Sequence, residues 1–290
     1  DPAKYFLPTP EFNENESEII DAAEYMFNCL NIKIINKEMS ENNKEWIVAF
    51  DPGKVNFAFI IEEVDKEMMS SLQSKCPAKK DRFVKGLRKN DDEPSSSYVE
   101  FLESFYHCGK TILCVNTDIT KDSGEMKEDE PKKRRKKGEP KEIKPKSTKK
   151  GSKTLDMGFF IKLTNVLDRY KEYFDKCSTV IIEQQMSFGS KINTMAIKIA
   201  QHTYSYFLFR YGATKKIIEF PSYNKTQILG APGGLEKPKR KKWAIEKADE
   251  IWALRGDLET CSLVGSKKKK DDMSDCLLHV LSYIIVTYYS

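Results

Sequence analysis

The stretch WIVAFDPG, residues 46–53, is the clearest guide to the fold of this 290-residue chain. Its apolar residues have the β-branched and aromatic character of a buried strand, which ends at an acid, Asp51. A Pro-Gly-Lys turn then leads into a second apolar run at 55–64, a hairpin-like pattern. The sequence therefore predicts two adjacent strands with a carboxylate at the end of the first.

Strand and helix patterns alternate through the rest of the chain. Further strands are expected at 111–118, 179–183 and 215–220, and helices at 156–176, 191–211, 239–253 and 271–288. This order, β-β-β-α-β-α-β-α-α, predicts an α/β fold with a mixed sheet flanked by helices.

Three segments lie outside this pattern. Residues 1–45 are expected to form an N-terminal helical extension, with a helix at 13–31. Residues 65–108 form a polar insertion, irregular as far as residue 98, and 121–153 form a basic low-complexity insertion that we expect to be disordered. Apart from these two insertions, residues 46–290 are expected to form one domain.

The net charge of +5 belongs to one segment rather than to the whole chain. Residues 126–153 contain 13 Lys and Arg against 5 Asp and Glu, a balance of 13 − 5 = +8, so the remainder carries 5 − 8 = −3. Within that segment PKKRRKK, residues 131–137, is compatible with a nuclear import signal, a non-specific DNA tether or a plain charged linker. The sequence does not choose among these three.

Cysteine usage and hydropathy narrow the cellular context. The 7 cysteines include no Cys-x-x-Cys pair, and an odd number argues against a disulfide framework, so an intracellular protein with reduced thiols is expected. No run of 18 or more apolar residues exists, which predicts no membrane partner. The sequence leaves open the nucleus, the mitochondrion and a viral replication site.

Four acids stand where a metal-dependent nuclease needs them. Asp51 and Glu183 each end an apolar run, while Asp272 and Asp275 are three residues apart on one face of the last helix. A charge directly after a buried strand is costly without a partner, so we expect a cation to join these sites. Each acid alone also has a plain structural explanation, as a turn residue, a solvated strand end or a favourable helix N-terminus.

Ligand chemistry and neighbouring charge indicate which cation and which substrate. Oxygen ligands without a His or Cys cluster favour Mg²⁺, with Mn²⁺ as a substitute, over zinc. Four lysines at 267–270, directly before the last two acids, fit a phosphate backbone that crosses the site. Two ions about 4 Å apart would activate water and stabilise the leaving oxygen of an in-line phosphodiester cleavage.

These residues also carry a resemblance to a known family. The pattern Asp-x-Gly-x-x-Asn-x-Ala at 51–58, Ile-Ile-Glu-Gln-Gln at 181–185 and Asp-Asp-x-x-Asp at 271–275 resembles the RuvC-type Holliday junction resolvases, and the poxviral and fungal mitochondrial branches look closest. The similarity extends over 46–64, 110–118 and 156–288.

The resemblance implies an RNase H-like fold and a homodimer that resolves four-way DNA junctions by paired symmetric nicks. By position, Asp51, Glu183, Asp272 and Asp275 would be its metal-binding catalytic acids. Bacterial members carry an aromatic wedge three residues after the glutamate, where this chain has Met186, with Phe188 two residues further on.

A set of cationic and polar residues is expected to contact DNA. These are Lys54, Asn56, Phe188, Lys191, Lys225, Lys239, Arg240, Lys241, Lys242, Lys268 and Lys269. A solvated surface is the plain alternative for the lysines. His279 lies one helical turn after Asp275, and we expect it to be a packed or surface histidine rather than part of the site.

Three other functions compete with junction resolution. One is an RNase H-like nuclease on RNA, RNA–DNA hybrids or other branched DNA, and another is a junction-binding module that has lost cleavage. The presence of all four acids speaks against that loss. The third is an actin/Hsp70-type ATPase, whose first loop also reads Asp-x-Gly; the glycine-rich loop at 231–234 lacks the acid that its second phosphate loop carries.

Overall fold

The computed structural model describes residues 43–85, 93–121, 155–186, 192–267 and 269–289. The chain divides into two units, 1–44 and 45–290, and the sheet and helices described below belong to the second. The predictions of a helix at 13–31 and of a disordered insertion at 121–153 therefore fall on residues that lie almost wholly outside the described ones.

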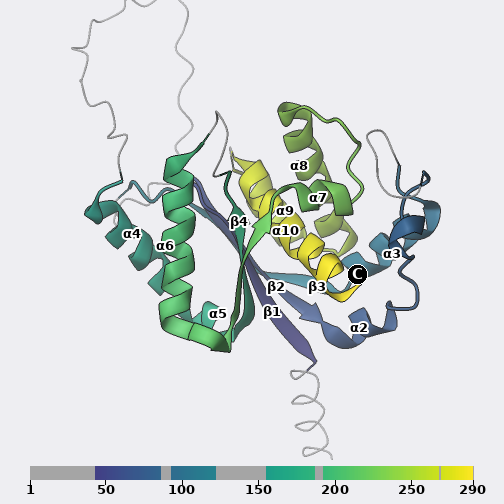
Figure 1. Ribbon diagram of the computed structural model, residues 1–290, viewed down its shortest axis with the longest axis horizontal. Coiled ribbons are helices and arrows are strands. Elements are labelled where there is room, and N and C mark those ends of the chain that lie inside the picture. Colours follow the sequence, from purple (N-terminus) through teal and green to yellow (C-terminus); the bar gives the residue numbers. More distant parts are fainter. Residues whose placement is uncertain (1–42, 86–92, 122–154, 187–191, 268, 290) are drawn as a thin grey trace, which may run out of the picture. The chain divides into compact units, whose positions relative to one another are not determined.

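A five-stranded mixed sheet forms the centre of the domain (Figure 1). Its strands are β1 (Lys44–Asp51), β2 (Phe57–Asp65), β3 (Gly109–Thr117), β4 (Cys177–Gln184) and β5 (Lys216–Pro221), arranged in the order β3-β2-β1-β4-β5. β2 and β3 are antiparallel, whereas β1, β4 and β5 run parallel to one another. The predicted α/β fold class, a mixed sheet flanked by helices, is therefore confirmed.

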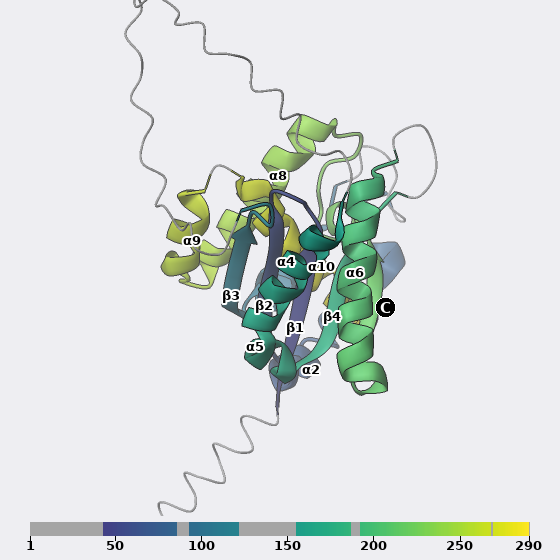
Figure 2. The same ribbon diagram turned by 90° about the vertical axis from the view of Figure 1, so that its left-hand side faces the viewer.

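Helices cover both faces of the sheet (Figures 1 and 2). On one face lie α4 (Met157–Arg169), α5 (Lys171–Lys176) and α6 (Thr194–Tyr211), and on the other lie α3 (Ser96–Tyr106), α7 (Tyr223–Ile228), α8 (Lys237–Leu254) and α10 (Lys270–Tyr288). The chain also forms α2 (Lys66–Ser71), α9 (Leu258–Gly265) and two 3-10 turns, Lys79–Asp81 and Gly212–Thr214.

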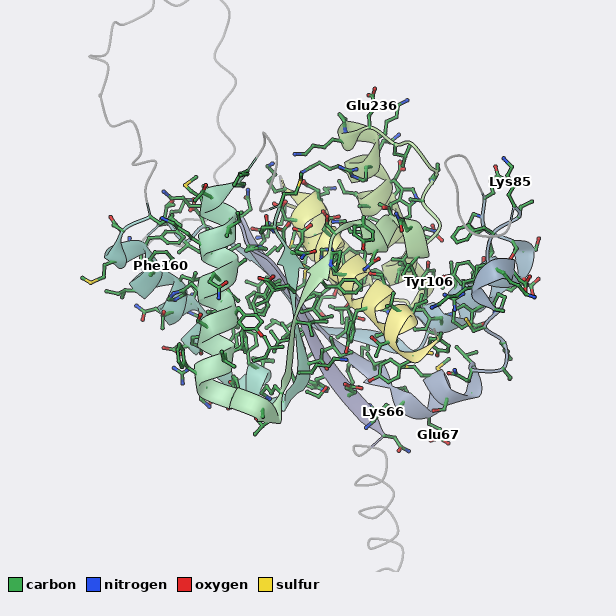
Figure 3. All side chains as sticks on the ribbon, viewed as in Figure 1. Lys66, Glu67, Lys85, Tyr106, Phe160 and Glu236 are labelled. Atoms are coloured by element: carbon green, nitrogen blue, oxygen red, sulfur yellow. The ribbon has the colours of Figure 1, made fainter. Side chains whose placement is uncertain are left out.

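The alternation of β1 explains why its apolar run is continuous. Ile47 and Ala49 point into the core beneath α3, α8 and α10, while Val48 and Phe50 point into the core beneath α4, α5 and α6. All four are fully buried, because a strand covered on both faces has no solvent side. Side chains fill the space on both sides of the sheet (Figure 3).

The prediction that residues 65–98 are irregular is wrong. They contain α2 and the start of α3, and α3 carries a buried stripe of Tyr98, Phe101, Leu102, Phe105 and Tyr106. These residues follow helical spacing, but polar neighbours on both sides hide the pattern in the sequence. The helix predicted at 156–176 is instead two helices, which divide at Tyr170.

A buried ion pair fastens the C-terminal end of α8 to the sheet. Nη1 of Arg255 lies 2.7 Å from Oε2 of Glu62, which is fully buried on β2. Thr111 donates a 2.5 Å hydrogen bond to the same carboxylate and accepts one of 3.0 Å from Trp252. This anchoring holds the far end of α8, whose N-terminal end carries the basic residues discussed below.

None of the described helices is both long and apolar enough to cross a bilayer.

Candidate active site

Parallel strands bring the first two acids together. Asp51 ends β1, and Glu183 is the second-last residue of β4, whose neighbour Ile182 pairs with Phe50. Because the carboxyl ends of parallel strands meet at one edge of a sheet, these two carboxyl groups become neighbours. They lie close enough that each shifts the pKa of the other.

The last helix brings the other two acids to the same place. α10 packs against β2 and β4 through residues such as Met273, Cys276 and Leu277, all buried. Asp272 and Asp275, which share one face of this helix, both raise the pKa of Asp51 electrostatically. The structure therefore gathers all four predicted acids in one cluster.

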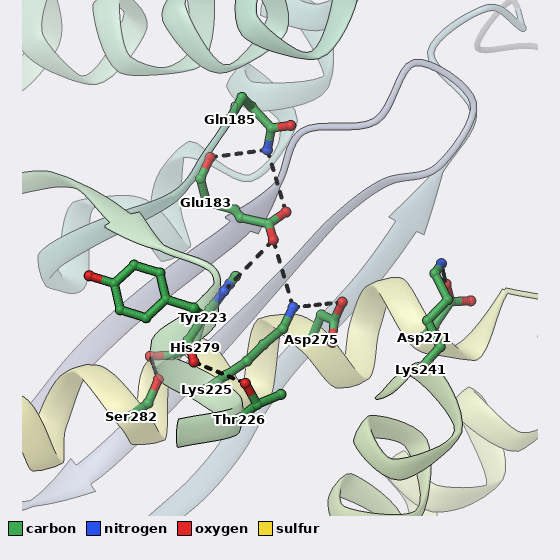
Figure 4. Close-up of polar contacts among 10 residues, drawn as sticks. All are labelled: Glu183, Gln185, Tyr223, Lys225, Thr226, Lys241, Asp271, Asp275, His279 and Ser282. Atoms are coloured by element: carbon green, nitrogen blue, oxygen red, sulfur yellow. Dashed lines mark hydrogen bonds and ion pairs between the residues drawn. The ribbon is translucent and has the colours of Figure 1, made fainter. Parts of the chain in front are cut away.

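Lys225 lies inside this cluster rather than on the surface (Figure 4). Its Nζ is 2.7 Å from Oδ2 of Asp275 and 3.7 Å from Oε1 of Glu183, and only 7% of its side chain is exposed. The predicted contact of Lys225 with DNA phosphates stays a prediction, and the structure places this lysine among the acids rather than on the exposed surface. β5 ends at the same edge of the sheet, and the short α7 that follows carries the lysine inward.

The pKa values of the first two acids in the cluster are shifted in opposite directions. Burial raises the pKa of Asp51 well above its ordinary value, and the charges of Glu183, Asp272 and Asp275 raise it further. Burial also acts to raise the pKa of Glu183, but Lys225, His279 and Asp51 outweigh it and lower that pKa. Without a cation, Asp51 is therefore the more readily protonated of the two acids.

Burial and neighbouring charges also shift the pKa values of Asp272, Asp275 and Lys225. Burial raises the pKa of Asp272 to about 6, with a further contribution from Asp271, and burial also raises that of Asp275. Burial disfavours the ammonium of Lys225, but Asp275 and Glu183 more than compensate, so its pKa rises. The positive charge of one buried lysine thus offsets only part of the repulsion among several neighbouring carboxyl groups.

The donor set fits a hard divalent cation. All four acids offer oxygen ligands, the type that Mg²⁺ and Mn²⁺ prefer. Oδ2 of Asp272 is buried with no hydrogen-bond partner among the described residues, so it is an oxygen in need of a positive partner. In the described residues no three His, Cys, Asp or Glu side chains are arranged as ligands of one ion. Ion binding would therefore require the carboxylates to rotate away from Lys225.

Two neighbours of Glu183 were not expected to belong to the site. Gln185 turns back and donates from Nε2 to the backbone oxygen of Glu183 at 3.1 Å, and to its Oε2 at 3.4 Å. His279 is fully buried, with Nε2 3.9 Å from Oε1 of Glu183. The spacing of His279, one helical turn after Asp275, was the sequence feature that could have placed it at the site. The sequence around Lys225 contains no feature that indicates its burial.

The tight loop between β1 and β2 requires a glycine at position 53. We expected this glycine from its place in the Asp-Pro-Gly turn, where it could let a phosphate approach the backbone. A Cβ on Gly53 would lie 2.2 Å from the backbone oxygen of Asn56. The loop between β1 and β2 folds so tightly that its own carbonyl fills the space a side chain would need.

Gly53→Ala is expected to lower the free energy of unfolding by about 1–3 kcal/mol, because backbone rather than a flexible side chain must move. Urea unfolding measures the change. Gly265→Ala is the matched control, since no atom lies within 4 Å of its added Cβ, and its stability should stay the same or rise by up to about 1 kcal/mol. Equal stability of the two variants would contradict the close approach.

Basic residues border the acids on two helix ends. Lys239, Arg240 and Lys242 are exposed at the start of α8, and Lys269 is exposed just before α10. Lys241 is half-buried and forms an ion pair with the buried Asp271, which joins the two helix ends. This pairing makes Lys241 partly a structural residue.

The other predicted DNA contacts are distributed as follows. Lys54 and Asn56 lie in the loop after Asp51 and are partly exposed, with Nζ of Lys54 5.8 Å from the ring centre of Phe159. Met186, just beyond β4, is 62% exposed. Phe188, Lys191 and Lys268 lie outside the described residues, so their predicted roles stay predictions.

Comparison with known proteins gives distant relatives. No protein-family model matches the chain. It is 29% identical over 265 residues to Uncharacterized protein 170L of Invertebrate iridescent virus 6, covering 82% of this chain and 88% of that protein. It is 31% identical over 133 residues to Uncharacterized protein 97L of Invertebrate iridescent virus 3, covering 45% of this chain and 58% of that protein.

Among solved structures, that of RuvC from Thermus thermophilus aligns with 83% of this chain and 97% of its own, at 10% sequence identity and a TM-score of 0.37. The viral relatives have no described activity, and this structural likeness is too distant to add to what the site itself indicates.

Proposed function

We propose that the protein is a Mg²⁺-dependent endonuclease that cuts four-way DNA junctions, acting as a homodimer that makes paired symmetric nicks. The observation that supports this most is the convergence of Asp51, Glu183, Asp272 and Asp275 at the carboxyl edge of the sheet, where Lys225 lies between Glu183 and Asp275. The selectivity for junctions and the dimer rest on the motif resemblance.

The proposed chemistry assigns a role to each side chain. Asp51, Glu183, Asp272 and Asp275 would hold the cation, which supplies an activated water and stabilises the charge on the leaving oxygen. Asp51 must release its proton when the cation binds, because a ligating carboxylate is ionised. Lys225 balances the acids while no cation is present, and its ammonium remains available to a phosphate oxygen when the cation takes over that task.

The exposed cations on α8 and before α10 suit the phosphate backbone. Lys239, Arg240, Lys242 and Lys269 lie on helix ends that the Lys241–Asp271 ion pair holds together. Charges of one sign grouped beside an acidic cluster attract DNA and position its backbone there, without reading sequence.

A cleavage assay on four substrates tests the proposal. Immobile and mobile four-way junctions should be cut in Mg²⁺ or Mn²⁺ and left intact in EDTA, while linear duplex and RNA–DNA hybrid should be cut far more slowly. A plasmid with an extruded cruciform separates paired from single nicks, since paired nicks give a linear product and single nicks an open circle. Equal cutting of linear duplex and junction would contradict junction resolution.

Preferential cutting of the hybrid would instead favour an RNase H-like activity. Tight junction binding without cleavage in either cation would indicate a binding module. Both outcomes would overturn the proposal as stated.

Replacing Lys239, Arg240 and Lys242 together by Gln is expected to weaken junction binding and to make it less dependent on salt. The slope of log K against log [salt] should fall by about 0.9 for each DNA phosphate that the variant no longer neutralises. Fluorescence anisotropy over a series of salt concentrations measures both quantities.

A matched control replaces three exposed cations on the opposite face of the sheet, Arg169, Lys171 and Lys176, by Gln. The control removes the same net charge, so an equal fall in slope would show that the α8 cations have no special contact with DNA.

A further inference from the structure

His279 is a buried polar side chain that the proposed chemistry has not used. It is fully buried on α10, and neither Nδ1 nor Nε2 has a hydrogen-bond partner among the described residues. Each buried polar group without a partner costs about 1–3 kcal/mol. An apolar side chain would fill the same space without that cost, so packing alone does not explain a histidine here.

Two neighbours of the ring, Phe220 and Ser282, give it no hydrogen bond. Phe220 packs edge-to-face against it, with ring centres 6.2 Å apart. The hydroxyl of Ser282 donates to the backbone oxygen of His279 and not to its ring. An imidazole carries at least one N–H in either protonation state, so this buried ring has a hydrogen bond to donate.

Glu183 is the acceptor that this N–H faces. Its Oε1 lies 3.9 Å from Nε2 of His279 and 3.7 Å from Nζ of Lys225 (Figure 4). Both distances exceed the roughly 2.9 Å of an ordinary N–H···O hydrogen bond. The carboxylate therefore lies between two donors without a close bond to either, and a small rotation would bring it to one of them.

We propose that His279 is a positioning residue for Glu183, donating its Nε2–H to that carboxylate and fixing its orientation toward a bound divalent cation. This inference rests on the metal site of the proposed function. A bound cation would compete with Lys225 for Glu183, and the imidazole would then supply that carboxylate with a hydrogen bond. Hydrogen bonds to ligating carboxylates tune metal affinity in this way.

Two substitutions separate positioning from packing. His279→Leu fills a similar volume without a donor, while His279→Gln places an N–H₂ group at a similar reach. In the full chain without DNA, Mn²⁺ affinity is measured from the EPR signal of the free ion, and thermal midpoints are measured in EDTA. His279→Leu should weaken Mn²⁺ binding by about 10- to 100-fold. Its midpoint in EDTA should be unchanged or raised, because two unpartnered nitrogens are removed.

His279→Gln should recover most of the Mn²⁺ affinity. This should hold even if Gln packs less well than Leu and lowers the thermal midpoint in EDTA. His202→Leu is the matched control, because His202 bonds to Thr164 on α4, a helix on the opposite face of the sheet from α10, and should leave Mn²⁺ binding unchanged.

The outcomes distinguish the inference from the proposed function. If the wild type binds Mn²⁺, Asp51→Asn abolishes binding and His279→Leu binds as tightly as the wild type, the positioning role is overturned and the metal site stands. The same holds if Leu and Gln weaken Mn²⁺ binding equally. If the wild type binds no Mn²⁺ at all, the proposed function fails, and the inference fails with it.

Discussion

Asp51→Asn and Glu183→Gln are each expected to reduce Mg²⁺-dependent junction cleavage by at least about 100-fold, while junction binding stays the same or becomes slightly tighter. Each substitution keeps the shape of the side chain but removes the negative charge that would hold the cation, and loss of a metal ligand removes the activated water. Binding should persist because both substitutions leave unchanged the exposed cations that we propose contact DNA. Removing one acid also weakens the electrostatic repulsion between the site and the DNA phosphates. Single-turnover cleavage rates and anisotropy binding curves measure the two effects.

Glu219→Gln is the matched control, since Glu219 is an exposed acid on β5, the strand next to that of Glu183. It should cleave at the wild-type rate. Near wild-type cleavage by either Asp51→Asn or Glu183→Gln would remove that residue from the proposed metal site.

Lys225→Met is expected to lower the free energy of unfolding by about 3–5 kcal/mol at neutral pH in EDTA. The lysine is buried between Asp275 and Glu183, so its loss leaves buried carboxylates without their counter-charge. The pKa values of both carboxylates should therefore rise. An acid with a raised folded-state pKa stabilises the fold below its unfolded-state pKa and loses that contribution as pH rises through the folded-state pKa. The deficit should therefore shrink in acid.

Urea unfolding at several pH values, with EDTA or with Mg²⁺, measures this deficit. Mg²⁺ should restore much of the lost stability, because a cation can take the position of the ammonium. Lys242→Met is the control, since Lys242 is exposed and forms a surface ion pair with Glu246, and its change should stay within about 0.5 kcal/mol. A Lys225→Met protein as stable as the wild type at neutral pH would show that the ion pairs contribute little.

Local sequence patterns are enough to predict the elements that carry the acids. Residues 46–51 and 179–183 are apolar runs with strong β-preference, and both are strands in the structure, each with its acid in the last two residues. The stripe of apolar residues after Asp275 likewise predicts α10 almost to the residue. These features are readable because periodicity and local preference act over neighbouring residues.

The interior of the site, in contrast, depends on how distant elements pack. Lys225 follows a short polar segment with no apolar pattern of its own, and it is internal only because β5 ends beside β4. In the sequence, His279 resembles any other histidine on an amphipathic helix. In the structure, Phe220 of β5 covers the face of the helix that carries it. Which distant groups share a buried space depends on strand order and helix packing, and no local pattern encodes that. The four carboxylates can be identified in the sequence, whereas the burial of Lys225 and His279 beside them follows only from the tertiary structure.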